Sequence, residues 1–114
     1  MTHGEAEALL GFRISPGWTF HEIHRGGELA AFVMQQGREV HAWRSPKFAG
    51  RWGTRGDIER LLGPILAQHG EVLTKVRADN QAAHRFVSRL GFERTAEIDG
   101  VAHYRAVRCN HARL

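Results

Sequence analysis

The sequence predicts a mixed α/β fold, with a mostly antiparallel sheet, a central parallel strand pair and two main helices. The first half holds three short strand patterns separated by glycine-containing turns, and the second half holds two amphipathic helix patterns with strands between and after them. A strand that lies between two helices needs a right-handed crossover connection, which makes it parallel to a neighbour in the sheet. The 114 residues suffice for one domain and are too few for two, so we expect a single domain over residues 1–114.

The first half is expected to form a meander of three strands. Residues 1–16 are weakly patterned and hold at most a short helix at 5–10. Strands are predicted at 18–24, where side chains alternate between two faces, at 29–35, where an apolar run is typical of a buried strand, and at 39–44. The signals that end these strands are Arg25-Gly26-Gly27, Gln36-Gly37-Arg38 and Ser45-Pro46.

The first main helix is predicted at 54–69. Thr54 followed by Asp57 resembles a capping box, in which side chains satisfy backbone N–H groups at the helix start. Gly70 is expected to end the helix, and Pro64 is expected to kink it because proline removes one backbone donor. The apolar residues recur at the spacing of one helix face, at Ile58, Leu61, Leu62, Ile65 and Leu66.

A strand at 72–77, a second helix at 80–90 and a final hairpin complete the prediction. Asp79 is expected to cap the second helix, and Gly91 to end it. The apolar stripe of this helix is Ala83, Phe86, Val87 and Leu90. The hairpin joins strands at 92–98 and 101–107 across Asp99-Gly100.

The composition is that of a soluble globular protein with more basic than acidic residues. The net charge is +4 with neutral histidines and the isoelectric point is about 10.2, which suits an anionic partner such as nucleic acid, an acidic protein face or a phosphorylated cofactor. The basic residues are scattered, which argues against nucleic acid and leaves a slightly basic solvated surface as the alternative. No apolar run approaches the roughly 20 residues that span a bilayer.

The sequence also bears on location and on metal binding. No export signal is apparent in the first fifteen residues. Cys109 is the single cysteine and cannot form an internal disulfide, so we expect a reducing compartment, the cytoplasm. The eight histidines show no metal-ligand spacing, and we expect no metal site.

One segment carries a family pattern. From Val76 to Phe92 the sequence has a strand, then Asn80 and Ala83 as N-x-x-A, then a helix that ends in Gly91-Phe92. This arrangement resembles the strand-helix-strand segment of the GCN5-related N-acetyltransferases. Residues 97–101 resemble the terminal hairpin of that family, and the preceding order of three strands and a helix agrees with it. The resemblance runs from about residue 29 to 107 and implies transfer of an acetyl group from acetyl-CoA, as co-substrate, to an amine.

The phosphate loop of the family is altered in this chain. Members usually carry R/Q-x-x-G-x-G/A before the long helix, whereas Ala49, Trp52 and Thr54 stand at the three motif positions here. Such a loop aims backbone N–H groups at a pyrophosphate, and arginines can add charge. Two interpretations stay open, a shifted loop that still binds phosphate and a plain flexible connection. The cofactor residues implied by the resemblance are Ala42, Trp43, Gly50, Arg51, Trp52, Gly53, Thr54, Arg55, Asn80, Ala83 and Phe86.

Acetyl transfer needs a base for the amine and an acid for the departing thiolate. Glu39 and His41 lie on one face of the third strand and are the candidate bases, although a histidine on a strand is more often exposed or satisfied in the core. The family often places its acid, a tyrosine, where this chain has Val87. Tyr104 is the candidate replacement, and the alternative for it is packing with the hydroxyl at the surface. Asn80 is expected to bond the pantetheine arm, or else to initiate the helix.

The resemblance also implies a shortened acceptor half. Family members usually begin with a strand and two helices that build much of the acceptor pocket, and only about 17 residues precede the first predicted strand here. The acceptor, a small molecule or a protein amine, would then meet a site that is open, completed by a second subunit of a homodimer, or absent. Short proteins of this kind resemble those that bacteriophages often encode. The alternative function is a non-catalytic binding or interaction module.

Overall fold

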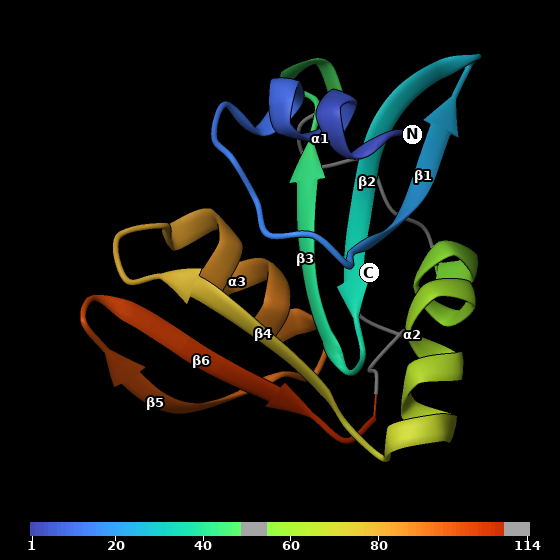
Figure 1. Ribbon diagram of the computed structural model, residues 1–114. Coiled ribbons are helices and arrows are strands. Elements are labelled where there is room, and N and C mark those ends of the chain that lie inside the picture. Colours follow the sequence, from blue (N-terminus) through green and yellow to red (C-terminus); the bar gives the residue numbers. More distant parts are fainter. Residues whose placement is uncertain (49–54, 109–114) are drawn as a thin grey trace. The chain divides into compact units, whose positions relative to one another are not determined.

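The computed structural model describes residues 1–48 and 55–108. The chain divides into two compact units, Met1–Gly53 and Thr54–Leu114. Each unit has its own antiparallel strands and its own helical cover (Figure 1). The predicted class, a mixed α/β fold with mostly antiparallel strands and two main helices, is confirmed.

Unit 1 is a three-stranded meander preceded by a helix. The strands are β1 (Thr19–Arg25), β2 (Glu28–Gln36) and β3 (Glu39–Arg44), and each pairs antiparallel with the next. A short 3-10 turn, Pro46–Phe48, follows the third strand. The three strands lie within one residue of their predicted bounds, because glycine turns mark both hairpins clearly in the sequence.

The N-terminal helix of unit 1 is longer than predicted. Helix α1 (His3–Leu10) begins earlier because Thr2 and Glu5 form a capping box, each side chain accepting a hydrogen bond from the other's backbone N–H. Gly11 ends the helix in the left-handed conformation, with φ of 81°. The apolar stripe of this helix is weak, so the spacing of apolar residues predicts only residues 5–10 of the helix.

The segment from α1 to β1 is fixed to the sheet by packing and by hydrogen bonds. Ile14 N–H donates to the Glu7 carboxylate at 2.8 Å, and His3 Nε2 bonds the Ile14 carbonyl at 3.1 Å. The core of this unit is Ala6, Phe32 and Met34, with Met1, Leu10, Ile14, Trp18, Phe20 and Trp43 packed around it. Residues 1–16 are therefore an integral part of unit 1.

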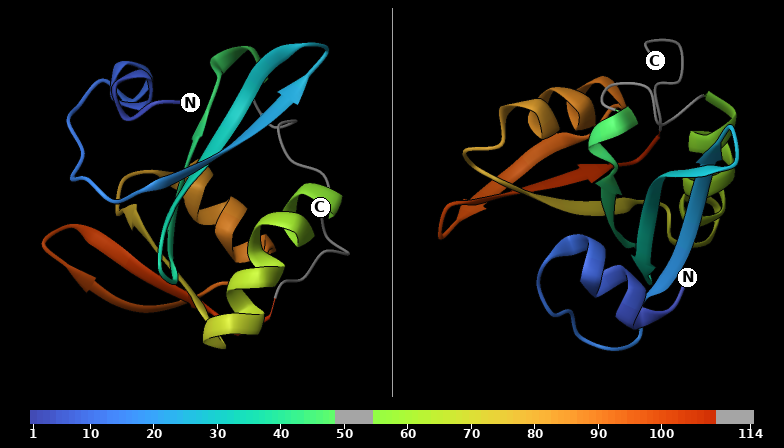
Figure 2. Two further views of the ribbon diagram at one scale, coloured as in Figure 1. Left: turned by 45° about the vertical axis from the view of Figure 1, so that its right-hand side comes forward. Right: turned by 90° about the horizontal axis from the view of Figure 1, so that it is seen from above.

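Unit 2 contains two helices and a three-stranded antiparallel sheet. Its elements are α2 (Arg55–His69), β4 (Val72–Arg77), α3 (Gln81–Arg89), β5 (Glu93–Ile98) and β6 (Val101–Ala106). Strand β6 lies between β4 and β5, as Figure 2 shows. Asp99 and Gly100 turn the hairpin with φ of 52° and 76°, the positive values that a tight two-residue hairpin turn requires.

The two helices of unit 2 are buried to different degrees. Four stripe residues of α2, Ile58, Leu61, Leu62 and Ile65, are at most 5% exposed, and the helix runs through Pro64. The stripe of α3 is only half-buried until Leu90, at 4%. Helix α2 is thus held by apolar burial, whereas α3 needs other contacts.

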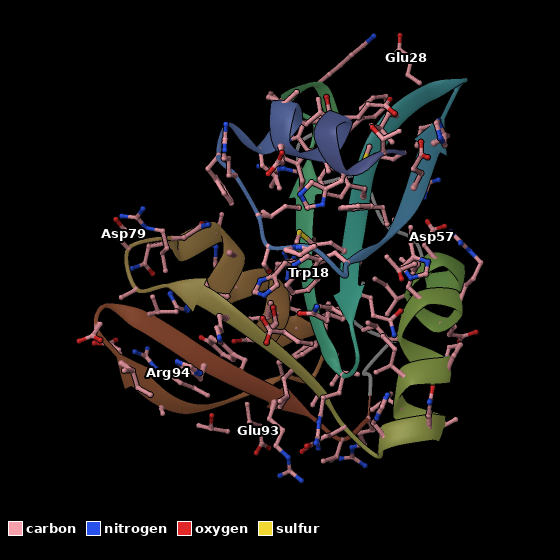
Figure 3. All side chains as sticks on the ribbon, in the orientation of Figure 1. Trp18, Glu28, Asp57, Asp79, Glu93 and Arg94 are labelled. Atoms are coloured by element: carbon pink, nitrogen blue, oxygen red, sulfur yellow. The ribbon has the colours of Figure 1, made fainter. Side chains whose placement is uncertain are left out.

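The start of α3 corrects one prediction. Asn80, not Asp79, is the N-cap: its Oδ1 accepts a hydrogen bond from Ala83 N–H at 3.2 Å. Asp79 lies in the turn before the helix (Figure 3), where its carboxylate pairs with Arg77 at 3.4 Å. Both residue types cap well, so the sequence alone favours neither of two adjacent candidates.

Candidate functional site

The two candidate bases, Glu39 and His41, are joined in the structure. They stand two residues apart on β3 and therefore point to the same face of the strand. His41 Nε2 lies 2.6 Å from Glu39 Oε2, and both side chains are about one-third exposed, at 29% and 33%. A carboxylate only accepts hydrogen bonds, so Nε2 of a neutral His41 carries the proton and Nδ1 is left as the acceptor. The pair has the arrangement of a base held by an orienting carboxylate.

Trp18 forms one wall beside this pair. Its indole meets the His41 ring edge to face, with 5.5 Å between ring centroids and 71° between planes. The indole N–H donates to Ser15 Oγ at 3.2 Å, and Figure 3 shows the side chain near β3. Because Trp18 also packs on the core of unit 1, the orientation of His41 is coupled to that core.

The two β3 residues expected at the cofactor differ in their surroundings. Ala42 is exposed and faces away from Glu39 and His41. The Trp43 indole stacks on Phe32, with 5.5 Å between centroids and 21° between planes, and packs against the unit 1 core. Packing thus occupies one face of this side chain, and the strand backbone is the part of Trp43 that suits a cofactor contact.

Asn80 has the first of its two expected roles, at the start of the helix, and its side chain keeps a donor for the second. Its Oδ1 is used by the helix cap, while its Nδ2 has no partner within residues 1–48 and 55–108. The residue is exposed, and Ala83 and Phe86 on the same helix are half-buried. A free amide donor beside a small side chain fits an extended ligand arm with carbonyl groups.

The structure reveals one residue that the sequence reasoning missed, His84. Its Nδ1 lies 2.6 Å from the Tyr104 hydroxyl and its Nε2 lies 2.9 Å from the Arg77 carbonyl oxygen. A carbonyl only accepts, so Nε2 carries a proton, and in the neutral ring Nδ1 accepts a hydrogen bond from the Tyr104 hydroxyl. His84 borders the apolar stripe of the helix, three residues before Val87, and that position was the available signal.

The contacts of Tyr104 correct the expectation of a hydroxyl at the surface. Tyr104 is only 5% exposed, and its hydroxyl bonds His84 beneath α3. The pair joins the middle of β6 to α3, and through the Arg77 carbonyl to the end of β4. Val87, at the position where the resembled family often has a tyrosine, is half-buried in α3.

The predicted phosphate loop lies outside the described residues. Gly50, Arg51, Trp52, Gly53 and Thr54 belong to this part of the chain, as does the expected capping box at Thr54. Arg55 opens α2, and its backbone alone is described. These cofactor residues remain predictions.

The described residues contain neither a grouped set of metal ligands nor a membrane-spanning helix. Within 1–48 and 55–108, no three His, Cys, Asp or Glu side chains are grouped as metal ligands. None of the helices in these ranges has the length and apolar character needed to cross a membrane.

Comparison with known proteins identifies the fold. No protein-family model and no curated protein matches the chain in sequence. Among solved structures, it is similar to the PaiA N-acetyltransferase of Thermoplasma acidophilum in complex with coenzyme A, at a TM-score of 0.65 and 11% identity over 89% of this chain and 65% of that one. The ribosomal-protein-S18-alanine N-acetyltransferase of Escherichia coli matches at 0.62 and 19% identity, over 82% and 70%.

A chimera of the Vibrio cholerae spermidine N-acetyltransferase SpeG and hSSAT matches at a TM-score of 0.64 and 17% identity, over 96% of this chain and 81% of that one. The chain is therefore shorter than these neighbours and shares their architecture at low identity. Its fold is that of the GCN5-related N-acetyltransferases.

Proposed function

We propose that this protein is an acetyl-CoA-dependent N-acetyltransferase that acts on an amine. The observation that carries the proposal is the fold shared with solved N-acetyltransferases, and it is supported by the sequence resemblance at Asn80, Ala83 and Gly91-Phe92 in and around α3. Fold alone does not fix activity, so the proposal also depends on the side chains that could bind the cofactor and move protons.

The described residues that the resemblance implies at the cofactor are proposed to hold the pantetheine arm. The unshared Nδ2 of Asn80 would donate to a carbonyl of the arm, beside Ala83 and Phe86. The backbone of Ala42 and Trp43 would supply donors toward the thioester carbonyl. Acetyl-CoA brings an activated acyl group, and the remaining chemistry is the transfer of protons. The loop from Gly50 to Arg55 is proposed to contact the phosphates.

His41 is proposed as the base and Glu39 as the residue that orients it. The amine nitrogen attacks the thioester carbonyl, its proton passes to His41 Nδ1, and the carbon–sulfur bond breaks to release a thiolate that takes up a proton. Tyr104 is the one tyrosine available as acid, but its proton is already shared with His84. The contacts favour a structural role for Tyr104, and water is then the donor to the thiolate.

The acceptor is proposed to be an amine of a small molecule or a protein. Among the structural neighbours, one is a ribosomal-protein-S18-alanine N-acetyltransferase and another is a spermidine N-acetyltransferase. Helix α1 is the helix described before β1. The acceptor is proposed to meet a site that is open or completed by a second copy.

A second candidate function is a non-catalytic binding or interaction module. Its support is the apolar Val87, half-buried where the family often has its acid. This candidate keeps the fold and loses acetyl transfer.

Calorimetric titration with acetyl-CoA at low ionic strength separates the two. One-to-one binding followed by amine-dependent release of coenzyme A thiol supports the enzyme. His41→Gln is then expected to lower kcat by about 10²-fold or more with little change in acetyl-CoA affinity, and Glu28→Gln, at an exposed position at the start of β2, is the control. Binding without release by any amine, or no binding at millimolar ligand, contradicts acetyl transfer.

A further inference from the structure

The second half of α3 presents two arginine side chains to an open hollow on unit 2. Arg85 and Arg89, with His84 and Ser88, line this hollow, whose volume is about 440 Å³. That volume is many times the roughly 30 Å³ that one water molecule occupies in the liquid. A small polyatomic anion therefore has room there.

The positive charge at this hollow is not neutralised by neighbouring side chains. Helix α3 contains no Asp or Glu, and Asp79, just before it, already pairs with Arg77. Within residues 1–48 and 55–108, neither Arg85 nor Arg89 has an ion-pair or hydrogen-bond partner. Like charges four residues apart on a helix repel each other, so an anion between them would relieve a destabilising contact.

The other lining residues define what the anion would meet. Both ring nitrogens of His84 are engaged, with Tyr104 and with the Arg77 carbonyl, so His84 forms a fixed wall. Ser88 is exposed, three residues from Arg85 on the same helix face, and its hydroxyl can donate. The end of a helix nearest its C-terminus is the negative end of its dipole, so the side chains alone must supply the attraction.

This donor set matches one class of ligand. Two guanidinium groups offer planar forks that suit the oxygens of a phosphate, and a hydroxyl adds a single donor. A dianion neutralises both arginines, whereas a carboxylate leaves one charge uncompensated. We propose that Arg85, Ser88 and Arg89 form a binding site for a phosphate monoester dianion.

Two sources can provide such a group. One is the 3′-phosphate of coenzyme A, which rests on the proposed acetyl-CoA-dependent function. The other is free inorganic phosphate, which does not. Both present the same dianion, and the experiment below distinguishes them.

The first arm titrates the full chain with inorganic phosphate at low ionic strength, followed by calorimetry and by amide NMR shifts. We expect saturable binding with shifts centred on α3. Affinity should fall about tenfold or more in Arg85→Ala/Arg89→Ala, since each bond from a charged donor is worth about tenfold. The matched control, Arg13→Ala/Lys75→Ala, removes the same charge from exposed positions outside α3 and should keep the affinity.

Arg85→Lys/Arg89→Lys keeps the charge but loses the planar forks, so an intermediate affinity is expected. Equal loss of affinity in the control pair would show a general charge effect and overturn the site. Unchanged affinity in Arg85→Ala/Arg89→Ala, with circular dichroism showing a folded protein, would overturn it as well.

The second arm compares coenzyme A with dephospho-coenzyme A. If the 3′-phosphate is the ligand, the native protein prefers coenzyme A by about tenfold or more, and Arg85→Ala/Arg89→Ala abolishes the preference. Equal binding of both, together with arginine-dependent binding of inorganic phosphate, supports the site with free phosphate as its source. Phosphate binding without any coenzyme A binding supports this site while contradicting the proposed function. Absence of phosphate binding together with equal binding of the two coenzymes overturns the inference.

Discussion

Strand β2 of unit 1 and strand β5 of unit 2 are held in place in opposite ways. Five consecutive residues of β2, from Ala30 to Met34, are buried, whereas all six residues of β5 are exposed. Strand β2 pairs on both edges, with β1 and β3, while β5 pairs only with β6 and has a bulge at Arg94/Ala96. Unit 1 is thus specified by apolar packing, and the exposed part of unit 2 by strand pairing, turn chemistry and polar contacts.

The same contrast applies to the two clusters of polar side chains, Glu39–His41 and His84–Tyr104. The Glu39–His41 pair stands on the packed face of unit 1, next to Trp18. Helix α3 lacks a buried side chain between Gln81 and Arg89, and it is fixed by the Asn80 cap and by His84. We infer that unit 1 tolerates loss of a polar contact better than α3 does, and that α3 is the more easily loosened element.

The largest expected effect is at the centre of unit 1. Phe32 is fully buried between Phe20 and Trp43, so Phe32→Ala should lower the free energy of unfolding by about 3–5 kcal/mol through lost burial and a cavity. Phe12→Ala, at 61% exposure, is the matched control and should change it by less than about 0.5 kcal/mol. Urea denaturation measures both, and equal effects would contradict the packing contrast.

The next effect is at the His84–Tyr104 pair. His84→Ala leaves the buried Tyr104 hydroxyl without a partner, which should cost about 1–3 kcal/mol of unfolding free energy. Tyr104→Phe removes the hydroxyl itself and should cost less. His84→Asn places an acceptor near the former Nδ1 and should recover part of the loss. Gln81→Ala, at an exposed position on the same helix, is the reference. If His84→Ala lowers the unfolding free energy no more than Gln81→Ala does, the hydrogen bond to Tyr104 does not stabilise the fold.

A smaller effect tests the corrected helix cap. Asn80→Ala should lower the unfolding free energy by about 1 kcal/mol because the Ala83 N–H loses its acceptor. Asp79→Ala should change it by less than about 0.5 kcal/mol, since this carboxylate pairs only with an exposed Arg77. Thermal unfolding of the two variants shows which of the adjacent residues caps the helix. A larger destabilisation by Asp79→Ala than by Asn80→Ala would identify Asp79 as the cap.

The smallest effect concerns the ion pair that ties the chain start to β1. A hydrogen bond from the Met1 amine lowers the pKa of Glu22 below its ordinary 4.5, and the same bond raises the pKa of the amine above its ordinary 8.0. The carboxylate stabilises the fold above its ordinary pKa and loses this contribution as pH falls through its lowered value. The ammonium stabilises the fold below its ordinary pKa and loses this contribution as pH rises through its raised value.

The difference in melting temperature between the native protein and Glu22→Gln should therefore be greatest between about pH 4.5 and 8 and shrink at both ends. The measurement needs a free N-terminal amine, and acetylation of that amine is the matched control. A difference that stays constant across pH would show that this ion pair does not contribute.

Much of the fold could be predicted from the sequence because its signals are local. Glycine turns and the alternation of side chains predicted the positions of β1, β2 and β3. The spacing of apolar residues in α2 predicted the four that are buried, Ile58, Leu61, Leu62 and Ile65. The start of α1 was also encoded, in Thr2 and Glu5, but as a polar capping pattern that apolar periodicity does not reveal. The choice between Asp79 and Asn80 depended on backbone geometry that residue type does not determine.

The candidate site was predicted only where its members are close in sequence. Glu39 and His41 are two residues apart on one strand, so their common face followed from the strand period alone. His84 and Tyr104 are twenty residues apart, and their contact depends on how β6 pairs with β4 and where α3 lies on that sheet. No single-residue preference contains that information.

The bond between Tyr104 and His84 has a practical consequence. The chain contains one tyrosine, so every tyrosine ring-proton resonance comes from the place where α3 contacts β6. The protein thus has a built-in reporter for the seating of this helix, and no label is needed to follow it when a ligand arrives.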